Sequence, residues 1–282
     1  TGLTSPTYTY LEADQITDFG SGPPEYPADI VKVTFYQISA AVGRGFPRTV
    51  TFDLRTVLGS DPDFSSVVLL THIDAEPAID VSNTPHTLTT DAGTIQAPVK
   101  KFGPMSYDSA EASNGHISAP DSADWHFAAG EFTVELWARW TSNPAGTVDA
   151  LIGQRSGTQA SWNLVYNVAA GVLHFQYSVN GVSVTTIATD AFSPVLDQWY
   201  HLAVDRDASD DIRIYIGGAV RGGPTNVTAS FHNSTTVFTI GNTKDDLSAW
   251  AFDGFIDEVR ITKGVGRYGG AFPVPNFPHP DS

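Results

Sequence analysis

The segment 131–140, EFTVELWARW, places an apolar side chain at every second position. In an extended chain these side chains share one face: Phe132, Val134, Leu136, Ala138 and Trp140. A helix, with about 3.6 residues per turn, would spread the same side chains around its axis. The alternation therefore predicts a β-strand with one face against a core.

Short apolar segments recur from residue 64 onward, and turn residues separate them. The further segments are 65–74, 115–119, 150–153, 162–168, 172–179, 199–205, 212–216, 237–241 and 255–261. The chain contains 25 glycines and 18 prolines, and Gly217-Gly218 is a two-residue hairpin signal. No amphipathic helical pattern extends beyond a few turns. We therefore predict an all-β fold, a two-sheet antiparallel sandwich.

Residues 1–62 differ in character from the rest, and we place a domain boundary between residues 62 and 63. Residues 1–29 are rich in Thr, Ser, Pro and Gly, which predicts an extended arm. In residues 30–58, two alternating segments flank Gly43-Arg44-Gly45, which predicts a β-hairpin with a glycine turn. An isolated hairpin is barely stable in water, so this one is expected to pair with a larger sheet or with another molecule.

The net charge of the chain is −16, from 15 basic and 31 acidic residues. A field of this sign repels phosphate backbones, so we expect no nucleic-acid partner. No apolar segment approaches the ~20 residues of a membrane-spanning helix, so we expect no membrane partner. The chain has no cysteine, which excludes disulfides and thiol chemistry.

The segment 251–275 contains a predicted strand, 255–261. Because it comes late in the sequence, we expect it to complete a sheet whose other strands come earlier. Strict alternation would direct Phe255, Asp257, Val259 and Ile261 to one face, and Ile256, Glu258 and Arg260 to the other. A carboxylate among apolar side chains needs hydrogen bonds, a cation or a metal. Asp257 therefore requires an explanation.

Six segments, taken together and in this order, resemble one family. They are SSVVLLTHIDAE (65–76), KFGPMSYDSA (101–110), NGHISAPDSADWHFAAGEFTVELWARW (114–140), DQWYHLAVDRDASDDIRIYIGG (197–218), FTIGN (238–242) and FDGFIDEVRITKGVGRYGGAFPVP (252–275). The family is the laminin-G-like (LamG) jelly roll of the concanavalin A-like lectin/glucanase superfamily. More narrowly, the chain resembles the version found in virion structural proteins of tailed bacteriophages. The resemblance covers roughly residues 64–280, which we assign to a LamG-like domain of residues 63–282, and it leaves residues 1–62 outside.

The resemblance implies two stacked, curved antiparallel sheets, with loops at one rim available for ligands. It also implies a protein of a virion or a cell surface. It does not define a ligand, because function depends on the site and one fold serves many functions.

Catalysis by paired carboxylates is disfavoured, and we expect no enzymatic activity. Asp257 and Glu258 are adjacent in a strand and project to opposite faces, whereas retaining glycosidases need two carboxyl groups about 5 Å apart. The related glucanases have acids at alternating strand positions, and nothing here matches that pattern. The eight histidines show no His-x-x-x-His spacing.

Structural calcium is the better use for these acids. Ca²⁺ takes about six to eight oxygen ligands, often with two or three carboxylates. The resemblance implies that a calcium ion, where present, lies between loops at a rim. We select Asp257, Asp74 and Asp80, with Asp253 as a weaker candidate. The alternative is that Asp257 accepts hydrogen bonds from turn amides and that Asp74 and Asp80 are solvated.

Two tryptophans are candidates for stacking on a sugar ring. Trp250 lies in a predicted loop among small and acidic residues, and Trp162 follows a polar stretch. The alternative for both is a loop aromatic folded back over the core.

The functional prediction is a non-enzymatic virion structural protein of a tailed phage, a capsid decoration or tail protein. It would display the LamG-like domain for glycan or protein binding, and residues 1–62 would bind other virion proteins. Host-surface glycans and assembly into trimers are further partner predictions. The alternative is a bacterial cell-surface or secreted carbohydrate-binding adhesion domain.

Overall fold

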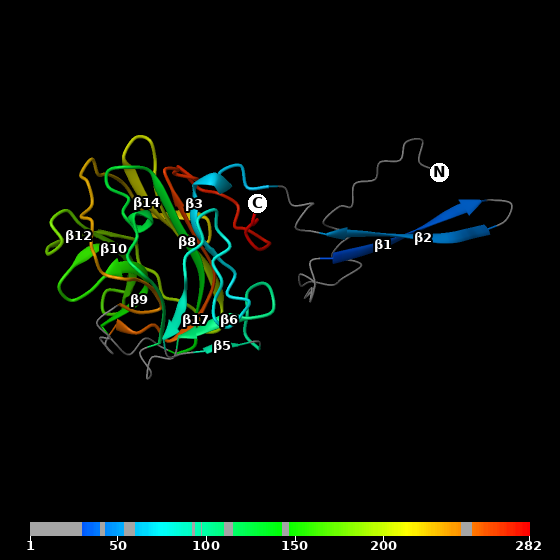
Figure 1. Ribbon diagram of the computed structural model, residues 1–282, viewed down its shortest axis with the longest axis horizontal. Coiled ribbons are helices and arrows are strands. Elements are labelled where there is room, and N and C mark those ends of the chain that lie inside the picture. Colours follow the sequence, from blue (N-terminus) through cyan, green and yellow to red (C-terminus); the bar gives the residue numbers. More distant parts are fainter. Residues whose placement is uncertain are drawn as a thin grey trace. The chain divides into compact units, whose positions relative to one another are not determined.

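The computed structural model describes residues 30–39, 43–53, 60–91, 94–96, 98–109, 115–142, 147–243 and 250–282 (Figure 1). The chain divides into two compact units, Thr1–Val57 and Leu58–Ser282. The division falls before the predicted boundary at residues 62 and 63. Among the described residues, no helix is long and apolar enough to span a membrane.

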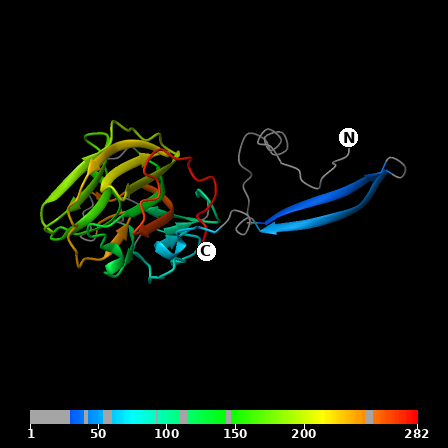
Figure 2. The same cartoon turned by 90° about the horizontal axis from the view of Figure 1, so that it is seen from above.

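The first unit contains one antiparallel hairpin of β1 (Ile30–Ser39) and β2 (Gly43–Asp53). The two strands form a long twisted ribbon (Figure 2). The predicted hairpin is confirmed, but its glycines do not form the turn. Gly43 pairs with Ser39 and Arg44 pairs with Ile38, so both residues belong to β2.

The second unit is a sandwich of two antiparallel sheets, which confirms the predicted all-β class (Figure 1). The seven-stranded sheet has the order β12 (Val184–Ala188), β11 (Val172–Ser178), β10 (Ala160–Asn167), β9 (Val148–Arg155), β16 (Phe238–Ile240), β7 (His116–Ala119) and β4 (Thr89–Asp91). The eight-stranded sheet has the order β15 (Ala219–Asn226), β14 (Asp211–Ile216), β13 (Trp199–Arg206), β8 (Phe132–Trp140), β17 (Gly254–Lys263), β6 (Ser106–Ser109) and β5 (Thr94–Gln96), and β3 (Val67–Thr71) also pairs with β17.

The core between the sheets is strongly aromatic. The alternation of β8 is observed as predicted, since Phe132, Val134 and Trp140 are fully buried core residues. From the facing sheet, Trp162 and Phe175 enter the same cluster. Rings such as Phe132 and Phe175, with centroids 5.7 Å apart, bury large apolar areas and specify how the two sheets pack.

The strand β17 departs from the predicted alternation. Its pairing with β8 shifts register between Asp257 and Arg260, and Glu258 has a φ of 50°. These are the features of a β-bulge, in which one extra residue reverses the facing of the residues that follow. As a result Ile256 and Val259, three positions apart, both belong to the core.

The strands that the sequence did not predict are short or polar. Examples are β4 with the sequence TTD, β5 with TIQ and β15 with AVRGGPTN. They lie at or beside sheet edges, where a strand pairs with one neighbour and can form with little apolar surface. The Gly217-Gly218 turn between β14 and β15 is confirmed, with φ values of 59° and 75°.

Candidate functional site

An open pocket lies at one end of β9. Arg155, Ser156, Gly157, Thr243 and Trp250 line it, and it holds about 220 Å³ of empty space that is continuous with solvent. Arg155 is the last residue of β9, whereas Thr243 follows β16 and Trp250 precedes β17. Three strand ends therefore contribute to one recess.

The guanidinium of Arg155 lies between the sheet and the indole of Trp250. Its Cζ is 4.6 Å from the centre of the Trp250 ring, and its Nη1 donates to Gln176 Oε1 at 2.6 Å. Burial lowers the pKa of Arg155 from its ordinary value. The hydrogen bond and the indole stack hold the Arg155 side chain in place, which leaves a partly exposed aromatic ring beside a fixed cation.

Thr243 lines the pocket, but its hydroxyl oxygen is buried. Thr243 is 5% exposed, and its Oγ1 has no hydrogen-bond partner among the described residues. The neighbouring Asn242 has an Nδ2 in the same condition. Both atoms are buried, so they do not offer a hydrogen bond to a molecule in the open space of the pocket.

The structure brings Trp250, but not Trp162, to this pocket. Trp162 has no exposed surface, its Nε1 donates to the Trp125 carbonyl oxygen at 2.7 Å, and its ring stacks on Phe127. The prediction that Trp162 forms a stacking surface is therefore wrong, because core rings cover it. The polar stretch before Trp162 leads directly into the buried strand β10.

Asp257 is buried, but it does not face the apolar core. It pairs with Trp137 of β8, a residue on the outer face of the eight-stranded sheet. Its carboxylate accepts hydrogen bonds from the amides of Lys101 (2.7 Å), Phe102 (3.2 Å) and Glu258 (2.8 Å). Burial, followed by the neighbouring Glu258 carboxylate, raises the pKa of Asp257 well above its ordinary value. The bulge accounts for the difference from the predicted facing.

The other predicted calcium ligands contact donors of the protein itself. Asp80 accepts from the amides of Leu70, Ser82 and His86, at 3.1, 2.9 and 2.8 Å. Asp74 accepts from the Met105 amide at 3.4 Å. Asp253 accepts from the hydroxyls of Thr141 (3.2 Å) and Ser142 (2.6 Å). Each carboxylate joins segments of the sandwich, and calcium binding stays a prediction.

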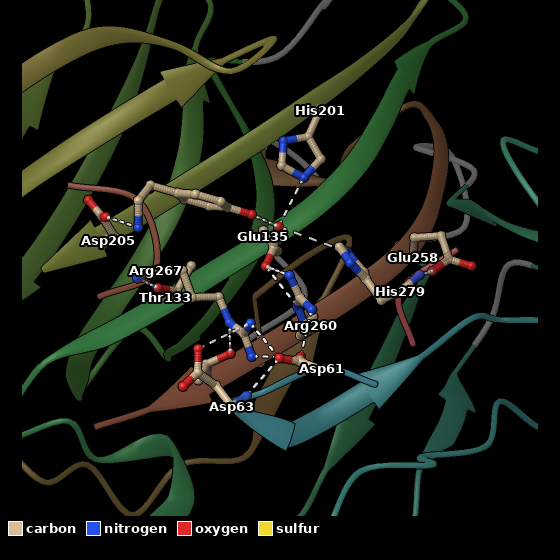
Figure 3. Close-up of polar contacts among 12 residues, drawn as sticks. Asp61, Asp63, Thr133, Glu135, His201, Asp205, Glu258, Arg260, Arg267 and His279 are labelled. Atoms are coloured by element: carbon tan, nitrogen blue, oxygen red, sulfur yellow. Dashed lines mark hydrogen bonds and ion pairs between the residues drawn. The ribbon is translucent and has the colours of Figure 1, made fainter. Parts of the chain in front are cut away.

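A group with metal-ligand geometry does occur among the described residues, and it contains none of those four acids. It consists of Glu135 of β8, His201 of β13 and His279 of the C-terminal segment, with ligand atoms within 4.8 Å of one another. All three are buried on the outer face of the eight-stranded sheet (Figure 3). The spacing of these three residues in the sequence does not reveal the group. The one available signal was Glu135, a charged residue in the alternating strand β8.

Ion pairs surround this group. Arg260 contacts Glu135 and Asp61, and Arg267 contacts Asp61 (Figure 3). The Tyr268 hydroxyl donates to Glu135 Oε2 at 2.5 Å. Although burial alone would raise the pKa of Glu135, the Arg260 guanidinium and the two histidines hold it well below its ordinary value.

Two antiparallel sheets around one aromatic core define a sandwich of the concanavalin A type. The chain belongs to the concanavalin A-like lectin/glucanases superfamily: the Laminin_G_3 family model matches residues 111–265, more than half of the chain. This confirms the resemblance at the level of the family. No curated protein matches the sequence.

Solved structures of toxin binding domains share this fold. The binding domain of Paraclostridial Mosquitocidal Protein 1 has a TM-score of 0.57 and 14% identity, over 72% of this chain and 50% of that one. A botulinum neurotoxin type C structure, described by its cell entry through two ganglioside molecules, has a TM-score of 0.52 and 15% identity, over 72% and 49%. The binding domain of botulinum neurotoxin DC in complex with rat synaptotagmin II has a TM-score of 0.51 and 15% identity, over 72% of this chain and 49% of that one. The chain spans about half the length of these structures, and the likeness concerns the fold.

Proposed function

We propose that this protein is a non-catalytic binding module that takes a carbohydrate in the pocket of Trp250, Arg155 and Thr243. The observation behind the proposal is the half-buried indole of Trp250, stacked on Arg155 at the entrance of an open recess. Sugar rings present C–H groups to an aromatic face and hydroxyls to polar neighbours. Arg155 and Ser156, which line the recess, supply those polar neighbours.

The fold supports the proposal by analogy. The botulinum neurotoxin type C structure shares this sandwich, and cell entry of that toxin is described as dependent on interaction with two ganglioside molecules. A ganglioside is a sugar-bearing lipid, so the sandwich is compatible with glycan recognition. The low identity of 15% means that the residues of this pocket have to support the proposal by themselves.

The absence of catalysis is part of the proposal. The described residues that line the pocket are Arg155, Ser156, Gly157, Thr243 and Trp250, none of which has a carboxyl group. Glycosidases of the common type need two carboxyl groups on either side of the scissile bond. The described lining therefore has groups that can hold a sugar and no pair of carboxyl groups.

A glycan array tests the binding proposal. The wild-type protein is expected to bind a defined set of glycans, and Trp250→Ala is expected to lose at least about tenfold in affinity, since stacking and burial of an indole contribute more than about 1.4 kcal/mol. Phe277→Ala removes another aromatic ring, 45% exposed and outside the pocket, and serves as the matched control. Equal binding by wild type and Trp250→Ala would refute the proposal.

The setting that we propose for this module is the surface of a tailed-phage virion, with residues 1–57, the unit that contains the hairpin, as the attachment segment. The support is the resemblance of the sandwich segments to phage structural proteins and the presence of a two-stranded hairpin in a unit of its own. A two-stranded ribbon gains stability when another strand or surface covers it. A bacterial surface adhesin is the competing setting.

Imaging of particles decides between these settings. Antibody labelling of purified virions should place the protein on capsid or tail, and a variant without residues 1–57 should fold but fail to join the particles. Normal incorporation of the truncated variant would contradict the attachment role. Detection of the protein on bacterial envelopes and not on particles would favour the adhesin.

A further inference from the structure

The buried group of Glu135, His201 and His279 has the composition and spacing of a transition-metal site. Glu135 Oε2 lies 3.1 Å from His201 Nε2 and 3.9 Å from His279 Nε2. Ligand atoms about 2.0–2.1 Å from a tetrahedral ion are about 3.3 Å apart. The two observed separations lie on either side of that value, and Figure 3 shows both imidazole rings directed at the carboxylate.

His279 supplies a second observation that points to a ligand. Its side chain is 3% exposed, and its Nε2 has no hydrogen-bond partner among the described residues. A buried imidazole nitrogen without a hydrogen-bond partner lowers the stability of the fold unless another species pairs with it. This nitrogen faces a carboxylate oxygen at a distance too long for a hydrogen bond and suited to an ion between them.

The two oxygens of Glu135 have separate partners. Oε1 accepts from Arg260, through Nε at 2.8 Å and Nη2 at 2.7 Å. Oε2 faces His201, His279 and the Tyr268 hydroxyl. Arg260 therefore fixes the orientation of the carboxylate in the manner of an outer-shell partner of a metal ligand, and it directs Oε2 at the two imidazoles.

We propose that Glu135, His201 and His279 bind one Zn²⁺ ion. Two imidazole nitrogens and one carboxylate oxygen suit zinc, whereas calcium takes oxygen ligands only. Zinc binding exchanges the hydrogen bond between His201 and Glu135 for metal bonds to both, and the Nε2 proton of His201 moves to its Nδ1. The metal also becomes the partner of the orphaned Nε2 of His279. The Tyr268 phenol oxygen or a water completes the coordination.

The ion would cross-link three segments that are distant in the sequence. Glu135 lies in β8, His201 in β13, and His279 in the segment after β17. Zinc at this point would fasten the C-terminal segment onto the outer face of the eight-stranded sheet. The inference concerns stability and does not depend on the carbohydrate proposal, because none of the three ligands lines the pocket of Trp250.

Calorimetric titration of the untagged full-length protein with ZnCl₂, after treatment with EDTA and dialysis, tests the proposal. Wild type is expected to bind one ion per chain and to melt at a higher temperature with zinc than without. His279→Ala and Glu135→Gln are expected to lose more than about 100-fold in zinc affinity, because loss of an outer-shell partner alone costs about 10–100-fold. His174→Ala, a histidine of β11 outside the group, should bind as wild type does.

Cobalt provides a readout that does not depend on variants or their folding. Co²⁺ in place of zinc should give the intense visible absorption of a four-coordinate site with nitrogen ligands, and CaCl₂ in a parallel titration should not compete. Absence of saturable zinc binding to wild type, a six-coordinate cobalt spectrum, or wild-type affinity in folded His279→Ala would each overturn the proposal.

Discussion

Arg260 and Glu135 form a buried ion pair across two neighbouring strands of the sandwich, β17 and β8. The side chains are 8% and 0% exposed, and Arg260 also contacts Asp61 at 2.9 Å. The guanidinium meets one oxygen of Glu135 through two nitrogens, a geometry available to arginine and not to lysine. This pair joins the closing strand to the centre of its sheet, outside the apolar core.

Removal of one partner of this pair should be strongly destabilising. Arg260→Met leaves the Glu135 carboxylate buried and without its main cation, and the expected loss is about 3–5 kcal/mol of unfolding free energy. Urea denaturation in the presence of a chelator measures it. Arg221→Met, which breaks the exposed pair with Asp190, should cost less than about 1 kcal/mol. If the two variants lose similar amounts of unfolding free energy, burial of the Arg260–Glu135 pair does not make its loss more destabilising.

The Tyr268 hydroxyl should contribute measurably to the same group. It donates to Glu135 Oε2 at 2.5 Å, and the Tyr268 ring stacks on Phe272 with a centroid distance of 3.5 Å. Tyr268→Phe keeps the stacked ring and removes the donor, and the expected cost is about 1.5–3 kcal/mol because the acceptor is charged. Urea denaturation of wild type and variant at equal pH gives the difference, and an unchanged midpoint would show that this bond contributes nothing net.

The pair of His72 and Glu258 should make stability depend on pH near neutrality. His72 Nδ1 lies 2.9 Å from Glu258 Oε1. Burial opposes the charge of His72, but the hydrogen bond to Glu258 outweighs it and raises the pKa of His72 above 6.5. The stabilisation is therefore fully present below about pH 6.5 and is lost as the pH rises through the higher folded-state pKa.

Melting temperatures of wild type and His72→Asn should reveal this dependence. The advantage of wild type is expected to be largest below about pH 6.5 and to decline as the pH rises through the raised folded-state pKa of His72. His174→Asn provides a contrast of opposite sign, since burial lowers the pKa of His174 and its protonation destabilises the fold on acidification. A difference between wild type and His72→Asn that is constant with pH would exclude the coupling.

The sequence predicted the parts of this structure that follow from local alternation. Strand β8 and the fold class required only the period of the apolar side chains. The bulge at Glu258 was not predictable, because one extra residue changes the facing of a strand without any change in composition.

The candidate sites also depend on contacts that local sequence patterns do not predict. Trp250 was identified as a loop aromatic, but its partner Arg155 is 95 positions away and only the fold brings the two together. The zinc-type group likewise combines Glu135 and His201, which are 66 positions apart and meet through the pairing of β8 with β13. Residue spacing identifies sites whose residues lie in one segment of the sequence, whereas each of these sites combines residues from several segments.

The limits of the sandwich unit lead to the last prediction. Asp61 is 6% exposed, accepts from Arg260 at 2.9 Å and from Arg267 at 2.8 and 2.9 Å, and its amide donates to the Ser282 carbonyl oxygen at 2.8 Å. A fragment that starts at residue 63 lacks this carboxylate and leaves two buried guanidinium groups short of a counter-ion. The fragment 63–282 should therefore be less stable than 58–282 by about 3 kcal/mol or more.

Urea denaturation of the two fragments measures that difference. The substitution Asp61→Asn in the fragment 58–282 is the matched control, because it removes the charge and keeps the chain length. It should reproduce most of the loss, since a neutral amide of the same shape cannot compensate two guanidinium groups. If 63–282 and 58–282 unfold at the same urea concentration, the contacts of Asp61 do not hold the sandwich together, and the structural boundary would lie where the sequence alone placed it.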